Sequence, residues 1–103
     1  MPAELTEKEF SQHLNTIFRA VSPEGDSLEL KLVEVKGYLS KPDEQSGMER
    51  FSAIFENRVN TIFPQNIYAL KHERMGEFEV FLVPVSSGPN GNRYEAVFNY
   101  FKQ

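Results

Sequence analysis

The chain of 103 residues contains no cysteine. It therefore forms no disulfide, and a zinc site would need both of its histidines, His13 and His72, together with carboxylates. The two histidines lie far apart in the sequence and show no metal-ligand spacing. We therefore expect neither a metal nor any other cofactor.

Long hydrophobic runs are also missing. No stretch approaches the roughly 18 consecutive apolar residues that a membrane-spanning helix needs. The first ten residues have neither the basic segment nor the apolar segment of a secretory leader. These absences predict a cytoplasmic protein that does not interact with membranes.

Positive charge is in deficit, with 11 Lys and Arg against 15 Asp and Glu and a formal net charge of -4. Nucleic-acid binding depends largely on the neutralisation of phosphates by basic side chains. Lys71, His72 and Arg74 make a short local basic cluster. The overall balance nevertheless predicts a protein that does not bind nucleic acid.

What the sequence does contain is typical of a small soluble core. Hydrophobic residues make up 40% of the chain and charged residues 25%, as in ordinary globular proteins. A chain of this length buries roughly 65% of the surface that its unfolded form exposes. We therefore expect residues 1–103 to form a single domain.

Residues 76–85 (GEFEVFLVPV) are the stretch around which we expect the fold to be organised. Apolar residues first alternate with Glu77 and Glu79, as in a strand with one buried face. From Phe81 onward the other face becomes apolar as well. This pattern predicts a strand that begins at the solvent and ends covered on both faces.

The remaining segments predict a helix and further strands. Thr6 and Glu9 have the spacing of a capping box, which indicates a helix over about residues 7–13 with His13 near its last turn, as a surface or terminal residue. A change of apolar phase near Leu32 and Val33 indicates a β-bulge, the bend of a barrel corner, or a strand end that is covered on both faces. Strands are predicted over residues 15–21, 27–35, 51–56, 67–73, 76–85 and 93–101.

The connections between these strands are mostly short. Gly76 is expected to adopt a positive φ in a tight turn, and residues 89–91 (PNG) are typical of a hairpin. Residues 36–50 are few in apolar side chains and predict a long flexible loop. The fold class is therefore mainly β: an antiparallel meander of about six strands curled into a barrel, with a short amino-terminal helix that plugs one end. The alternative is α+β, an open curved antiparallel sheet with the helix packed on one face.

The search for catalytic motifs finds no phosphate-binding loop and no nucleophile elbow. His72 with Glu77 and Glu79 is the candidate functional cluster, since a histidine and carboxylates can do acid–base work. His72 and its neighbour Glu73 point to opposite faces of a strand, and Glu77 or Glu79 can approach His72 only across a hairpin. The alternative is a core-facing His72 that is hydrogen-bonded to the backbone, to Tyr68 or to Tyr94.

The aromatic residues predict a core rather than a ligand cage. This interpretation covers Phe51, Phe55, Phe78, Phe81, Tyr94 and Phe98. Tyr100 and Phe101 are different, because they end an edge-like strand that can recruit another chain. They are therefore the candidate partner contacts.

Six segments, in this order, resemble a family of short uncharacterised bacterial proteins with a domain of unknown function. The segments are residues 10–19 (FSQHLNTIFR), 28–35 (LELKLVEV), 51–55 (FSAIF), 68–73 (YALKHE), 76–85 (GEFEVFLVPV) and 94–99 (YEAVFN). The resemblance implies an association with phage-tail-like or surface-assembly components. It implies no enzyme activity and no functional residue, and residues 36–50 are longer than the family's shorter forms.

Three functional hypotheses remain open at this point. The first is a non-catalytic module for protein–protein interaction or assembly, which binds a partner or another copy of itself by a sheet edge or by residues 36–50. The second is a small-molecule-binding β-barrel, which requires an interior that Phe and Tyr side chains do not fill. The third is an enzyme that uses His72 with Glu77 or Glu79 in a concave pocket.

Overall fold

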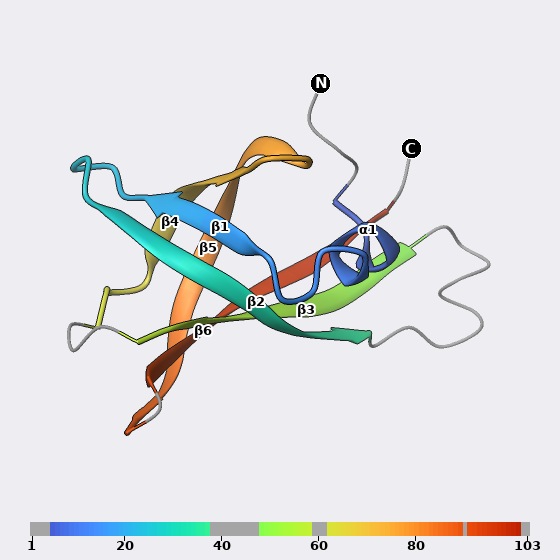
Figure 1. Cartoon of the computed structure of the whole chain (residues 1–103). Coiled ribbons are helices and arrows are strands. Elements are labelled where there is room, and N and C mark those ends of the chain that lie inside the picture. Colours follow the sequence, from blue (N-terminus) through green and yellow to red (C-terminus); the bar gives the residue numbers. More distant parts are fainter. Residues whose placement is uncertain (1–4, 38–47, 59–61, 90, 102–103) are drawn as a thin grey trace.

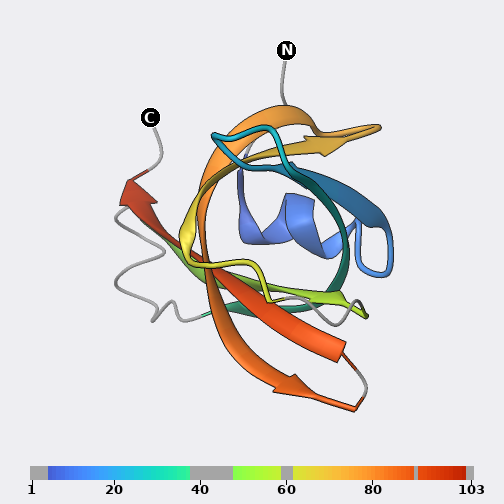
Figure 2. The same ribbon diagram turned by 90° about the vertical axis from the view of Figure 1, so that its left-hand side faces the viewer.

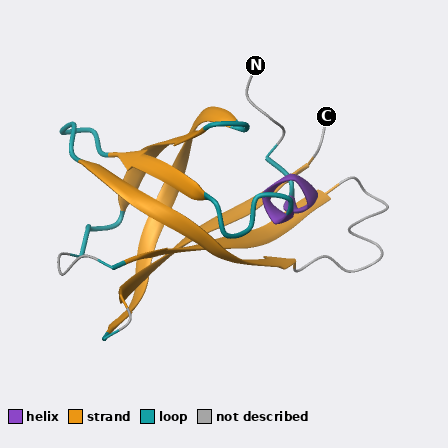
Figure 3. Cartoon of the chain, in the orientation of Figure 1, coloured by secondary structure: helices purple, strands orange, loops and turns teal. Residues whose placement is uncertain are grey.

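The computed structural model describes residues 5–37, 48–58, 62–89 and 91–101. These residues form one short helix and six strands (Figures 1 and 3). In chain order the elements are α1 (Glu7–Ser11), β1 (Ile17–Val21), β2 (Ser27–Gly37), β3 (Met48–Asn57), β4 (Asn66–His72), β5 (Gly76–Gly88) and β6 (Gly91–Phe101). No helix in this described part of the chain is long and apolar enough to cross a membrane.

The strands form a closed antiparallel barrel in the order β1-β2-β3-β6-β5-β4, which confirms the predicted barrel over the open sheet. This order differs from a simple meander in two pairings, because β4 lies beside β1 rather than beside β3, and β6 lies beside β3. The β3–β4 connection is therefore not a hairpin between neighbouring strands. Strand order of this kind depends on tertiary contacts that local patterns do not encode.

The helix α1 begins as predicted and ends earlier. The backbone N–H of Glu9 donates to the Thr6 hydroxyl at 3.1 Å, so Thr6 is the N-cap. The helix stops at Ser11, so its predicted extension to His13 is wrong. Asn15 adopts a positive φ of 69°, and its N–H donates to the Leu32 carbonyl at 2.7 Å. The chain is therefore turned onto β2 before another helical turn can form.

Two backbone irregularities bend the barrel strands. The register of β2 against β3 shifts between Leu32 and Glu34, which confirms the predicted bulge. A second shift, between Pro84 and Ser86 in β5, was not predicted. Pro84 lacks an N–H and cannot continue a regular ladder. The turn before β5 has Gly76 at a φ of 83°, as expected.

Burial along the strands differs from the prediction in one important way. Phe81 and Val85 on β5 are 52% and 50% exposed, so the expectation that this strand becomes covered on both faces is wrong, as is the placement of Phe81 in the core. The outer face of β5 belongs to a single-layer barrel and faces solvent. The strand buried on both faces is β3, where residues 51–55 are all buried.

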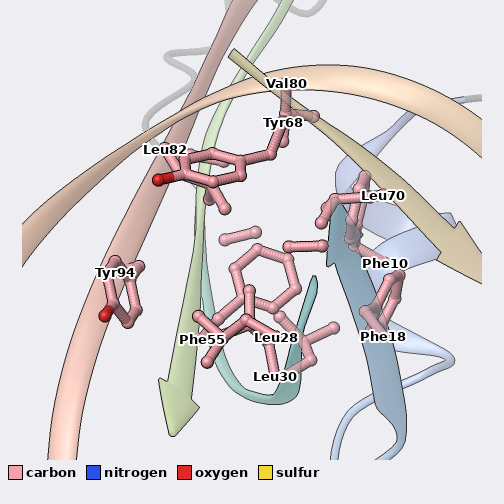
Figure 4. Packing of buried hydrophobic residues seen from close by; sticks show 14 of the residues in the cluster. Phe10, Phe18, Leu28, Leu30, Phe55, Tyr68, Leu70, Val80, Leu82 and Tyr94 are labelled. Atoms are coloured by element: carbon pink, nitrogen blue, oxygen red, sulfur yellow. The ribbon is translucent and has the colours of Figure 1, made fainter. Parts of the chain in front are cut away.

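The barrel interior is filled by apolar side chains from every strand (Figure 4). The largest fully buried side chains include Tyr68, Tyr94, Phe10, Phe18, Phe51 and Phe55. Figure 2, a view along the barrel, shows α1 inside the ring of strands. The predicted plug is therefore present, and we call this the α1 end. Phe10 of α1 has its ring centroid 5.2 to 6.1 Å from the rings of Phe18, Phe51, Phe78 and Phe98.

The opposite end is covered by residues 62–65, which precede β4, and we call it the loop end. The Tyr94 hydroxyl accepts a hydrogen bond from the N–H of Phe63 at 2.9 Å. The Tyr68 hydroxyl donates to the carbonyl of Pro64 at 2.6 Å. Two tyrosines of the core thus hydrogen-bond to the backbone of residues 63 and 64. The Phe63 side chain packs against the core.

The predicted loop over residues 36–50 is shorter at both ends than expected. Lys36 and Gly37 belong to β2, and Met48, Glu49 and Arg50 belong to β3. Residues 38–47 lie outside the described residues. The prediction that they form a flexible loop stays a prediction.

Candidate functional site

His72 lies at the end of β4, at the α1 end of the barrel. Alternation along β4 places His72 on the same inward face as Tyr68 and Leu70, which are buried. Its ring centroid is 4.3 Å from that of Phe18 and 4.6 Å from that of His13. The fold therefore brings the two histidines of the sequence into ring contact.

The hydrogen bonds of His72 fix its tautomer. Nδ1 accepts from the backbone N–H groups of Arg74 and Met75, at 3.0 and 3.1 Å. Because Nδ1 accepts from two N–H groups, the ring proton of the neutral histidine is on Nε2, which lies 2.9 Å from the Thr16 hydroxyl and donates to it. Thr16 in turn donates to the His13 carbonyl at 2.6 Å.

The environment of His72 favours this neutral form. Burial lowers the pKa of His72 below the usual 6.5, and the positive charge that His13 can carry lowers it further. Glu73 acts in the opposite direction, to a smaller extent. A second proton would have to go onto Nδ1, where it would displace the two N–H groups of the β4–β5 turn.

His13 lies just after the end of α1, as a terminal residue would, and is half-buried rather than fully exposed. Its side chain is 12% exposed, and Nε2 lies 3.6 Å from a carboxylate oxygen of Glu9, one helical turn earlier. The chain turns inward after α1, which carries the His13 ring onto that of His72. Nothing in the local pattern around His13 indicates this contact, because it depends on how β4 is placed beside β1.

A hollow of about 480 Å³ opens beside the two histidine rings. Its lining combines polar side chains of both charge signs with one exposed isoleucine. The lining residues are Gln12, His13, Thr16, Ile17, His72, Glu73 and Arg74. In chemical terms the hollow offers the His13 ring and an arginine, while both nitrogens of His72 are already occupied by hydrogen bonds within the protein.

The structure does not bring Glu77 and Glu79 to His72. Glu77 is the cross-strand partner of Lys71 and Glu79 that of Ala69, on the outer face of the β4–β5 hairpin. His72 faces inward, opposite Gly76 in the register. In the part of the chain that the structure describes, no three histidine or carboxylate side chains converge on a point where they could hold a metal ion.

A second feature, the far part of β6, concerns protein contacts rather than chemistry. The β5–β6 ladder runs from Gly88 and Gly91 to Val83 and Glu95, where it ends. From there β5 pairs with β4, and residues 96–101 of β6 pair with β3 alone among the described strands. The two strands diverge beyond this point (Figures 1 and 2). We call residues 96–101 the β6 edge.

Tyr100 and Phe101, the predicted partner contacts, belong to this edge. Their backbones pair with Glu49 and Met48 of β3. Their side chains lie outside the described residues. The outward-facing side chains described on the edge are those of Val97, which is 64% exposed, and Asn99, which is also exposed.

A protein-family model matches residues 5–98, which include α1 and every strand except the last three residues of β6. The chain belongs to the family described as Domain of unknown function (DUF6916). This result confirms the resemblance to an uncharacterised family. No curated protein and no solved structure matches the chain.

Membership of this family names no activity, so the geometry of the chain has to carry any functional argument. The residue pattern points to His72 but not to its contact with His13 and Thr16. The same pattern makes the end of β6 edge-like without locating the residue at which pairing with β5 stops. Pro84 could have indicated where this pairing stops, because Pro84 and the bulge beside it lie next to Val83, the last residue of β5 that pairs with β6.

Proposed function

We propose that the protein is a non-catalytic interaction module that binds protein by strand addition at the β6 edge. The observation that carries the proposal is the end of the β5–β6 ladder at Val83 and Glu95. Beyond it, no described strand pairs with residues 96–101 on the side away from β3, where their backbone N–H and C=O groups lie. An extended segment of another chain can pair with such groups, as in other cases of β-augmentation.

The filled interior supports this proposal over a small-molecule-binding barrel. Such a barrel needs an internal cavity, typically of about 300 Å³ or more. Here Phe18 and Phe55 meet edge to face at 5.3 Å between ring centroids, and the two interior tyrosines are 2% and 1% exposed. Binding through the exterior is therefore favoured.

The arrangement around His72 supports a non-catalytic role. A general base needs a nitrogen that can take up a proton, and a general acid needs one that can release it to substrate. Nδ1 of His72 accepts two backbone N–H groups and Nε2 donates to Thr16. Glu77 and Glu79 lie on the other face of the hairpin. The third hypothesis, an enzyme built on these residues, therefore has little geometric support.

The test compares native masses of the untagged protein in extract of its source cells. We expect the wild-type protein to run larger than a monomer, and both Val97→Lys and truncation after Asn99 to reduce that mass. Ile67→Lys is the matched control, because Ile67 is an outward-facing apolar residue of β4, 52% exposed, whose strand pairs with β5 at this position. A wild-type monomer in extract, or a mass that the edge variants leave unchanged, would contradict the proposal.

A cytoplasmic location and the absence of nucleic-acid and membrane partners stay predictions from the sequence. A bacterial source and a link to phage-tail-like or surface assemblies stay what the family resemblance implies. The proteins that co-migrate with the wild-type chain, and are lost with Val97→Lys, would identify the process.

A further inference from the structure

The β6 edge lacks the features by which proteins usually protect an exposed strand. Lysine, proline, an inward-pointing charge or a bulge normally prevent pairing with other chains. Residues 96–101 (AVFNYF) contain no charged residue, no proline and no glycine. The register of β6 against β3 is continuous from Asn92 to Phe101, so no bulge interrupts this ladder.

The strand on the other side of the divergence is protected. Glu77 and Glu79 of β5 are exposed on its outer face, over the stretch that pairs with β4 but not with β6. β5 and β6 diverge beyond Val83 and Glu95. In the diverging stretches, β5 carries the carboxylates of Glu77 and Glu79, whereas residues 96–101 of β6 carry no carboxylate. The uncharged strand is therefore the one that can accept a neighbour without electrostatic cost.

From these observations we propose that the β6 edge pairs with the β6 edge of a second copy of this chain, in an antiparallel arrangement. The inference rests on the proposed function and names its partner. The resulting dimer has a continuous sheet of β3 and β6 from one protomer followed by β6 and β3 from the other. Its two-fold axis passes near Phe98, at the middle of the edge.

The charge pattern favours a second copy as the occupant. A two-fold axis places a segment opposite itself, so a charged edge would set like charges against each other, which is destabilising across strands. With the axis at Phe98, Val97 of one protomer lies opposite position 99 of the other. Glu95 already pairs with Val83 of β5, so its carboxylate lies outside the stretch that faces the second copy. The exposed Val97 side chain gains a neighbour on the outer face of the extended sheet.

Sedimentation velocity of the purified full-length chain over a range of concentrations tests this arrangement. We expect a reversible monomer–dimer equilibrium in the wild type. Val97→Lys and Asn99→Lys should each raise the dissociation constant of the dimer at least about tenfold, because each dimer then carries two additional ammonium groups at the junction. Ile67→Lys, on the paired outer face of β4, should leave the constant unchanged.

The outcomes separate this inference from the proposed function. If the pure wild-type protein stays monomeric but forms an edge-dependent assembly in extract, the partner is not a second copy of the chain. The proposed interaction-module function would still hold. A dimer that survives both lysine substitutions overturns the edge as its interface. Circular dichroism of each variant shows whether the barrel is intact, and two independent edge positions guard against a folding defect in one of them.

Discussion

The two ends of the barrel are closed by different chemistry. At the α1 end, Phe10 enters the barrel and contacts four aromatic rings. Hydrogen bonds also connect His72 to Thr16, and Thr16 to the His13 carbonyl in the turn after α1. At the loop end, Tyr94 and Tyr68 hold the backbone of the β3–β4 connection. The α1 end is therefore closed by apolar packing and a histidine, whereas the loop end is closed by hydrogen bonds of two tyrosine hydroxyls.

The difference implies different responses to pH. Burial raises the pKa of the Tyr68 hydroxyl above its usual 10, and the Tyr94 hydroxyl and the Glu24 carboxylate raise it further. The loop end therefore keeps its hydrogen bonds throughout the neutral and acidic range. The α1 end contains His72, and burial holds the pKa of His72 below the usual 6.5, so acid weakens this end of the barrel.

The largest expected effect comes from removing the plug. Phe10→Ala should lower the free energy of unfolding by about 3 to 5 kcal/mol, because it deletes a fully buried ring and leaves a cavity between four others. Chemical denaturation measures the change. Phe81→Ala removes the same ring from an exposed position and should cost far less. Similar losses for the two variants would show that α1 does not seal the barrel.

The matching change at the loop end is smaller. Tyr94→Phe removes the acceptor of the Phe63 N–H and should cost about 1 to 3 kcal/mol, since a partly buried donor loses its partner. Tyr68→Phe, which removes a donor to the Pro64 carbonyl, provides the comparison within the same loop. Denaturation in urea reports both. If neither substitution lowers stability, the hydroxyls do not hold the loop.

The pH dependence separates the two ends directly. Above pH 6.5 His72 is neutral in both states and stability is at its full value. As the pH falls from 6.5 toward the lower pKa of the folded state, the unfolded chain takes up a proton and the folded chain does not. Stability therefore falls, by at most about 1.4 kcal/mol per pH unit from this group. Below the folded pKa this contribution is constant.

Two measurements examine that expectation. His72→Asn keeps an acceptor near the position of Nδ1 but cannot titrate, so it should flatten the decline of stability below pH 6.5. In NMR titrations of the wild type, the amide signals of Arg74 and Met75 should shift only as the pH falls below 6.5 toward the lowered pKa of His72, while that of Phe63 stays constant. A shift of Phe63 alone would reverse the assignment of the acid-sensitive end.

The smallest effect concerns the start of the plug. Thr6→Ala removes the acceptor of the Glu9 N–H and should cost about 1 kcal/mol. Thr6→Ser keeps the hydroxyl and should be close to the wild type in thermal unfolding. Equal losses in the two variants would indicate that the Thr6 methyl group, rather than the cap, matters.

Features with a local cause could be read from the sequence, whereas features with a tertiary cause could not. The change of apolar phase at Leu32 and Val33 requires an extra residue in the strand, and the bulge lies there. The cap at Thr6 and the turn at Gly76 likewise need only their neighbours in the chain. The aromatic content of a small antiparallel sheet predicted the barrel.

The errors concern faces and partners. Alternation shows that both faces of β5 are apolar near Phe81, but not whether anything covers the outer one, and the structure leaves it exposed. The contact between His13 and His72 depends on β4 lying beside β1, which no pattern near either residue encodes. For the candidate site, the sequence thus supplied His72 and the end of β6 but neither their neighbours nor their geometry.

Phe98 belongs both to the β6 edge and to the ring cluster around Phe10, with centroids 5.2 Å apart. Thermodynamic linkage couples pairing at the edge to folding: a chain that binds the edge only in the folded state stabilises the fold by an amount that rises with the logarithm of its free concentration. A protein that pairs with its own copy would melt at a higher temperature as it is concentrated. Loosening the plug with Phe10→Ala would in turn weaken pairing, although residue 10 is not part of the edge.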